Sequence, residues 1–326
     1  MPDRYARRDV IATAAVALLG LGGLRRAQAD EMTTLTVFAA GTLAKPLRAF
    51  DEVFQAAHPD IAVQPQFGGS VKMVKQITEL GEIADVVAAA DYSVIPKYMF
   101  GGVGRPAFAD WYAGFAGNAI TFMYTPRSKF AAEITPENWH DVLARPGVQI
   151  GRSNPDTDPS GYQILLMLKL AEIHYQRPGL AERILANAPE TNVRDTETEL
   201  IPALQSGQID YLGIYRSDAI QLGLDYVKLP PQVNLSDPRY ASLYARASVE
   251  TKNGTITGKP IVYAVTIPTN AAHARQARAW IAALLSSQGS AIMARSGFAP
   301  LRPAYVSDPR RIPVSLRSLV RSWPKG

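Results

Sequence analysis

The stretch "TVFAAGTLAKPL", Thr36 to Leu47, decides the fold because it predicts a buried strand that turns directly into a helix. Its joint, Ala39 to Thr42, consists of small residues and one hydroxyl. A helix start carries unpaired backbone N–H groups and the positive end of the peptide dipole, so small residues leave room there for an anion. The simpler alternative is that Thr42 only caps its own helix.

The same arrangement returns in "FGGSVKMV", where a strand, two glycines and Ser70 precede a second helix. Gly68 and Gly69 allow the backbone to approach a ligand closely. If the two strands are neighbours, the hydroxyls of Thr42 and Ser70 point to one place, which favours an anion site. Neither junction is a Walker loop, because no Gly-Lys-Ser/Thr follows.

Apolar runs and helical periods alternate from residue 34 to residue 90. Strands are predicted over 34–40, 61–67 and 84–90, and helices over 45–58 and 68–80. The inward positions of the two helices are Leu47, Phe50, Val53 and Phe54, then Val71, Val74, Ile77 and Leu80. This order predicts a mainly parallel α/β sheet.

Two further apolar strands, "NAITFMYT" and "GKPIVYAVTIP", lie far apart in the sequence and enclose a second α/β set. We expect them to be crossovers between two lobes, because the helix over 272–285 belongs with the first set. The predicted lobes are 30–115 plus 266–326, and 116–265. Ligands of open α/β sheets bind at the carboxyl ends of strands, so the cleft between the lobes is the expected site.

The second lobe carries three candidate side chains. Asp158 stands with Pro159 and Ser160 at the head of an apolar helix, Glu197 precedes another helix, and Tyr215 ends the strand "DYLGIY". Each has a structural alternative: Asp158 as a helix cap, Glu197 as a complement to the helix dipole, and Tyr215 as a packing residue.

Length and composition narrow the function classes. The 326 residues suggest two domains, and 47% of them are apolar, enough for a sizeable core. The formal charge of +5 comes largely from the N-terminus, and no basic stripe suggests nucleic acid as a partner. The absence of cysteine excludes disulfides, thiolate metal sites and a lipid-modified cysteine anchor.

Residues 1–29 read as a cleavable signal peptide. Arg7 and Arg8 precede an apolar run that is short for a membrane span, and "AQA" at Ala27–Ala29 fits a cleavage site. The paired arginines resemble a twin-arginine signal, with an ordinary secretory signal as the alternative. The mature chain is expected to begin near Asp30 as a soluble, periplasmic protein.

A family resemblance rests on several segments in one order. They are "VFAAGTLAKPL", "GGSVKMVKQITELGEIADVVAAADYSVI", "DWYAGFAGN", "ENWHDVLARPGVQIGRSNPDTDPSGYQ", "ETELIPALQSGQIDY" and "GKPIVYAVTIP". From about Leu35 to Pro300 the chain resembles the extracytoplasmic tungstate/molybdate-binding proteins of ABC transporters, in their archaeal-type branch. This implies the two-lobed periplasmic binding protein fold (type II), closing over one oxyanion. The implied partners are an ABC permease and its ATPase, with the protein a monomer that has no catalytic role and no cofactor.

The resemblance also implies roles for five positions. Thr42 and Ser70 take the places of two serines, Asp158 and Glu197 those of the family's two carboxylates, and Tyr215 that of its strand-end tyrosine. The chain departs from the family pattern at Thr42, which adds a methyl group, and at Ile214, where glutamate is usual. These differences bear on the choice between tungstate and molybdate.

The predicted site mixes donors with carboxylates. Hydroxyls and helix-start N–H groups can hold a dianion without lysine or arginine, whereas Asp158 and Glu197 would repel it. Either one carboxyl is protonated, or both bind the metal centre of the oxyanion directly, and the resemblance favours the second. Molybdenum(VI) and tungsten(VI) accept oxygen ligands, whereas sulfate cannot expand its coordination.

Two other functions compete with this one. A carrier of ferric ion, or of sulfate or phosphate, would share the fold, and two carboxylates with a tyrosine suit iron(III). A secreted hydrolase would need a base beside a nucleophile, but the four histidines lie away from Thr42 and Ser70 in the sequence. Those histidines are His58, His140, His174 and His273.

Overall fold

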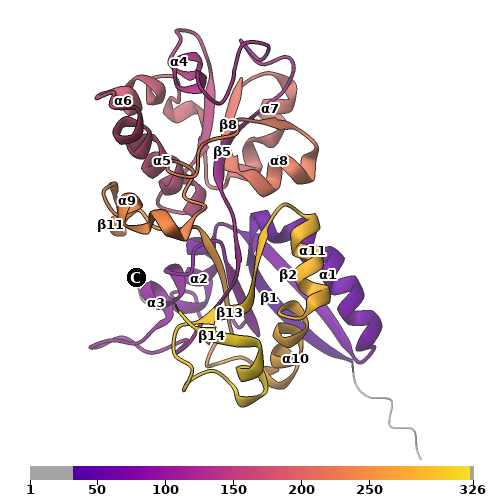
Figure 1. Ribbon diagram of the computed structural model, residues 1–326. Helices are drawn as coiled ribbons and strands as arrows, with labels where there is room; N and C mark the ends of the chain where they lie inside the picture. Colours follow the sequence, from indigo (N-terminus) through magenta and orange to yellow (C-terminus); the bar gives the residue numbers. More distant parts are fainter. Residues whose placement is uncertain (1–31, 324–326) are drawn as a thin grey trace, which may run out of the picture. The chain divides into compact units, whose positions relative to one another are not determined.

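Two β-sheets organise residues 32–323, the part of the chain that the computed structural model describes (Figure 1). The predicted signal peptide, residues 1–29, lies outside the described residues. Within 32–323, every helix is too short or too polar to cross a lipid bilayer.

The first sheet has seven strands, and the carboxyl ends of β1, β2 and β3 lie at one edge of it. Its order is β14 (Val320–Ser322), β13 (Ala299–Val306), β4 (Ala113–Gly117), β12 (Val262–Thr266), β3 (Val86–Ala89), β1 (Thr33–Ala40) and β2 (Ile61–Gly68). Pro65 is accommodated because β2 is an edge strand, where one side of the backbone needs no ladder partner.

The second sheet has five strands, and a separate hairpin completes the set. The sheet order is β7 (Val193–Arg194), β6 (Ile150–Ser153), β8 (Tyr211–Tyr215), β5 (Ile120–Tyr124) and β9 (Asp225–Tyr226). The hairpin pairs β10 (Ser248–Thr251) with β11 (Gly254–Thr257).

Helices and 3-10 turns surround these strands. With the seven-stranded sheet come η1 (Gly41–Leu43), α1 (Ala44–Ala57), α2 (Ser70–Thr78), α3 (Val94–Met99), α10 (Ala274–Leu284), α11 (Ser287–Arg295) and η5 (Val314–Leu319). Between the crossovers come α4 (Trp139–Leu143), α5 (Pro159–Tyr175), α6 (Leu180–Leu185), η2 (Glu190–Asn192), η3 (Glu197–Leu200), α7 (Ile201–Ser206), α8 (Arg216–Leu222), η4 (Pro238–Tyr240) and α9 (Ala241–Tyr244).

The central strands of both sheets bury residues on both faces, because alternate side chains of a strand point to opposite sides of its sheet. In β1, Val37 packs in the same core cluster as Phe50 of α1, whereas Phe38 packs with Val74 of α2. In β8, Tyr215 and Ile214 likewise belong to different core clusters. This layering confirms the predicted α/β class.

The predicted inward faces of the first two helices are largely confirmed. Leu47, Phe50 and Phe54 are buried, with Val53 packed against the same cluster. The prediction is wrong for Leu80, which is 72% exposed. Because α2 ends at Thr78, Leu80 lies beyond the helical repeat that would have turned it inward.

The sheets are mixed, which corrects the predicted mainly parallel arrangement. In the seven-stranded sheet β12 runs antiparallel to both β3 and β4, and in the five-stranded sheet β5 runs antiparallel to β8. The reason is the crossover. The chain leaves the first sheet at the carboxyl end of β4 and returns at that same end as β12, so β12 must run in the opposite direction.

The lobe boundaries stay a prediction, and strand pairing bears on their position. Ala116–Gly117 and Val262–Val265 lie in strands of the seven-stranded sheet, although the boundaries at 115/116 and 265/266 assign them to the second lobe. The passages between the two sheets therefore lie between Gly117 and Ile120 and, with the hairpin included in the return, between Tyr226 and Val262.

The late helix α10 packs on the first helix, α1. Trp280 of α10 donates its indole N–H to Asp51 of α1 over 2.8 Å, and both side chains are buried. The other carboxylate oxygen of Asp51 is buried without a hydrogen-bond partner among the described residues. Burial raises the pKa of Asp51 from 3.8 to about 7, although the bond from Trp280 lowers it.

We expect Asp51→Asn to change how stability depends on pH. Between 3.8 and about 7 the unfolded chain releases the Asp51 proton and the folded chain keeps it, so wild-type stability falls as pH rises. In that pH window, the free energy of unfolding of the asparagine variant should rise relative to that of the wild type by about 1.4 kcal/mol per pH unit. Urea unfolding at about pH 5 and pH 6 measures this. The exposed Asp60→Asn is the control, and parallel pH profiles for wild type and Asp51→Asn would contradict the prediction.

Candidate binding site

The carboxyl ends of strands in both sheets lead to the crossover. In the first sheet Ala40 of β1 is level with Gly68 of β2, and Gly117 at the end of β4 pairs with Val262. In the second sheet Tyr215, at the end of β8, pairs with Ile120 directly after the crossover. The predicted residues Thr42, Ser70, Asp158, Glu197 and Tyr215 all follow or end such strands.

Thr42 belongs to a buried network of hydroxyls rather than to a helix cap. Its Oγ1 lies 2.9 Å from the hydroxyl of Tyr263 in β12, and no side chain caps η1 or α1. The amide of Asn118, in the crossover, donates to the Tyr263 hydroxyl over 3.3 Å and to Ser217 Oγ over 2.8 Å. The simpler interpretation of Thr42 as a cap is therefore wrong.

Ser70 is buried and is the first residue of α2, two residues after the predicted start at 68. Its Oγ accepts a hydrogen bond of 2.9 Å from the backbone N–H of Ala90, at the end of β3. Accepting that bond fixes the position of the hydroxyl and leaves its own proton free to be donated elsewhere.

Asp158 and Glu197 meet at one serine. Ser160 Oγ lies 3.2 Å from Asp158 Oδ2 and 3.0 Å from Glu197 Oε2. Asp158 also accepts the backbone N–H groups of Ser160 and Glu197, over 3.3 and 3.2 Å. Asp158 is thus the cap of α5 and, at the same time, the contact that places Glu197 beside it.

Burial and mutual repulsion set the charge of this cluster. Burial raises the pKa of Glu197 well above its usual value, and the charge of Asp158 raises it further. Burial and the charge of Asp158 also raise the pKa of Asp218, in the first turn of α8. The cluster therefore favours a proton on Glu197 and on Asp218.

Tyr215 faces the same cluster from β8. It is fully buried, and its hydroxyl and Asp218 Oδ2 have no hydrogen-bond partner among the described residues. Its ring meets that of Tyr263 edge to face at 5.6 Å. Burial raises the pKa of Tyr215, and the neighbouring Tyr263 and Asp158 raise it further, so the phenol is a hydrogen-bond donor.

Two glycines bring the hydroxyl-bearing junctions against the carboxylate-bearing turns. A Cβ at Gly69, directly before Ser70, would lie 2.4 Å from the carbonyl oxygen of Thr157, directly before Asp158. A Cβ at Gly41, directly before Thr42, would lie 3.5 Å from Thr198, directly after Glu197. The five predicted residues therefore gather at one place in the fold, while their roles stay a prediction.

Residues 35–299 match the family described as bacterial extracellular solute-binding protein. The chain belongs to this family.

Two relatives show how far the likeness extends. The solute-binding protein is 37% identical over 300 residues to an uncharacterized solute-binding protein of Petrotoga mobilis, covering 90% of this chain and 92% of the relative. It is 35% identical over 300 residues to the molybdate/tungstate-binding protein WtpA of Pyrococcus abyssi, covering 83% of this chain and 86% of the relative.

Among solved structures, the periplasmic molybdate-binding protein of Azotobacter vinelandii matches with a TM-score of 0.61. That match covers 81% of this chain and 98% of the other at 18% identity, and shows the two-lobed fold alone.

Sequence reasoning missed three polar members of the cluster in this solute-binding protein. Tyr263 lies within an apolar crossover strand, Asn118 begins the other crossover, and Asp218 follows Tyr215 by three residues. A polar side chain inside an otherwise apolar strand is the signal that could have found Tyr263, because a buried phenol needs a hydrogen-bond partner.

Proposed function

We propose that this protein is the substrate-binding subunit of an ABC importer and captures tungstate or molybdate in a cleft that closes between its lobes. The observation that carries the proposal is the meeting of Asp158 and Glu197 at Ser160, inside a buried group of hydroxyls. The name of the Pyrococcus relative supports the same ligand. The partners would be a permease and its ATPase.

Each side chain has a role in this proposal. Thr42, Ser70 and Tyr215 donate hydrogen bonds to the oxygens of the oxyanion, as neutral donors do in anion sites without lysine or arginine. Asp158 and Glu197 supply oxygen ligands to the metal centre itself, once Glu197 has lost its proton. Tyr263 positions Thr42 through the bond of 2.9 Å.

The carboxylates make the site selective. Sulfate and phosphate offer no centre that accepts additional oxygen ligands, so two buried carboxylates repel them without compensation. Among residues 32–323, no group of three or more His, Cys, Asp or Glu side chains is arranged to hold a metal ion.

The hydrolase alternative has no support in the described part of the chain. His140 lies beside Asp141 and Arg177, and His273 beside Asp85. Neither is placed to act as a base for a hydroxyl of the cluster.

Ligand titration tests the proposal. We expect tungstate and molybdate to bind with 1:1 stoichiometry, and sulfate, phosphate and iron(III) to bind at least about a hundredfold more weakly, which is roughly 3 kcal/mol. Tryptophan fluorescence and calorimetry measure the stoichiometry and the affinity for each ion. Tight sulfate or iron(III) binding without tungstate binding would overturn the assignment.

A further inference from the structure

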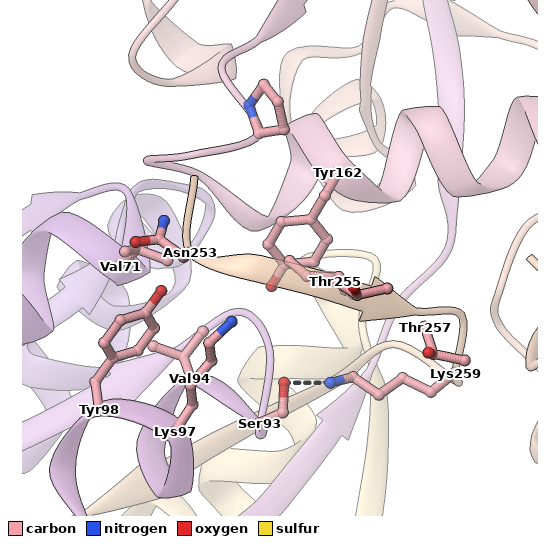
Figure 2. A pocket seen from close by; sticks show the side chains of 12 residues that line it. Val71, Ser93, Val94, Lys97, Tyr98, Tyr162, Asn253, Thr255, Thr257 and Lys259 are labelled. Atoms are coloured by element: carbon pink, nitrogen blue, oxygen red, sulfur yellow. Dashed lines mark hydrogen bonds between the residues drawn. The ribbon is translucent and has the colours of Figure 1, made fainter. Parts of the chain in front are cut away.

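A cavity adjoins the buried cluster of Asp158, Glu197 and Tyr215. It has a volume of about 260 Å³, and Figure 2 shows Tyr162, Lys97 and Lys259 around it. Its walls continue those of the candidate site: Val71 follows Ser70, and Tyr162 lies one turn after Asp158 on α5. The hairpin strand β11 supplies Thr257 to the wall.

The charge of this cavity is opposite to that of the cluster. The cluster contains the carboxyls of Asp158, Glu197 and Asp218, whereas the cavity lining includes Lys97 and Lys259 and, among the described residues, no Asp or Glu. Lys259 is paired with the buried Asp91 over 3.0 Å and also contacts Ser93, a contact drawn in Figure 2. Lys97 is exposed and, within residues 32–323, has no ion-pair partner.

This contrast raises a physical problem for the proposed function. A dianion that approaches the charge of Asp158, beside the protonated Glu197 and Asp218, is repelled until it reaches the hydroxyls and the metal–oxygen contacts form. Lysines in the mouth of a cleft reverse that potential over the approach path and raise the association rate. A lysine at the entrance can attract the dianion, so the inner site at Asp158 and Glu197 does not need a lysine for this purpose.

We propose that the cavity at Lys97 is an entrance site that binds the tetrahedral oxyanion transiently before it passes to Asp158 and Glu197. This inference rests on the proposed function. Lys97, Tyr98 and Thr257 all line this cavity and supply it with an ammonium group and hydroxyls, the kinds of donor that an oxyanion's oxygens accept from. Because no carboxylate lines the cavity to bind a metal centre, the entrance does not distinguish tungstate from sulfate, and selection occurs at the inner site.

Association kinetics test the entrance site. Stopped-flow fluorescence would compare tungstate binding to wild type, Lys97→Glu and Lys228→Glu. Lys228 is exposed and lies outside the lining, so the two variants change the net charge equally. At low ionic strength Lys97→Glu should associate about fivefold more slowly than Lys228→Glu, with the difference shrinking as salt is added. The dissociation rate constants should agree within about twofold.

The outcomes separate the two proposals. Equal association rates for Lys97→Glu and Lys228→Glu overturn the entrance site, as does a faster dissociation with unchanged association, which would place Lys97 in the final site. If wild type itself does not bind tungstate, the proposed function fails and the entrance site with it. Lys97→Gln, which removes one charge without reversing it, should give an intermediate rate and guards against a folding defect in the glutamate variant.

Discussion

Replacing Gly69 by alanine is expected to weaken tungstate binding about a hundredfold, roughly 3 kcal/mol, the upper end of what overpacking costs. The added Cβ would lie 2.4 Å from the Thr157 carbonyl oxygen and 3.2 Å from its carbon. Backbone atoms cannot rotate away as a side chain can, so the two junctions must separate. Because Thr157 precedes Asp158, separation withdraws a carboxylate from the cluster while each sheet stays intact.

Gly41→Ala is the matched control. Its Cβ would meet Thr198 at 3.5 and 3.6 Å, an ordinary contact, so binding should change by less than about threefold. Calorimetry gives the affinities, and X-ray scattering should show a smaller radius of gyration with tungstate for wild type and Gly41→Ala only. Wild-type affinity in Gly69→Ala would show that the approach of the two junctions is not required for binding.

Glu197→Gln is expected to weaken tungstate and molybdate binding by about 1–3 kcal/mol, tenfold to a hundredfold. Glutamine keeps the size of the side chain and can still donate a hydrogen bond, but it offers no anionic oxygen to the metal centre. A view in which Glu197 merely repels the dianion, or donates a proton to it, predicts equal or tighter binding instead. In this variant the difference between the affinities for tungstate and sulfate should also become smaller, because the proposal assigns that difference to coordination of the metal centre by Glu197.

Glu199→Gln controls for the loss of one charge in the same turn, since Glu199 is exposed and, within residues 32–323, accepts a side-chain hydrogen bond from Thr196 alone. Its affinity should match that of wild type. X-ray absorption of the tungstate complex gives the coordination number directly. A four-coordinate centre in wild type, with undiminished binding by Glu197→Gln, would leave Asp158 as a helix cap only.

Much of this fold follows from local patterns. The strands around Val37 and Leu212 are continuous apolar runs, and the helix at Phe50 has a clear repeat of 3.6, so each element is determined by its own residues. Asp158 followed by Pro159 predicts the start of α5, which places the Asp158 carboxyl at a strand-to-helix turn. The α/β class could therefore be derived from the chain alone, whereas the grouping of Asp158, Glu197 and Tyr215 with Thr42 and Ser70 was predicted only from the family resemblance.

The sequence could not reveal the direction of a strand within its sheet or the proximity of residues that lie far apart in the chain. The antiparallel course of β12 is not encoded in its own residues, because a buried strand has the same apolar run in either direction. Tyr263 reads as a core aromatic until β12 is known to lie beside β3 and β4, level with the crossover. Asp218 likewise reads as a helix-start carboxyl until Asp158 is brought near it from sixty residues away in the chain.

The central position of β12 has a consequence for the order of folding. β12 fills the space between β3 and β4, so these two strands cannot be joined in one sheet until residue 266 has been synthesised. Until then the inner edges of β3 and β4 lack their ladder partners, and unpaired strand edges invite pairing with other chains. Contacts between residues so distant in sequence also form slowly. The edges of β3 and β4 that will face β12 therefore stay unpaired while about 145 residues between β4 and β12 emerge.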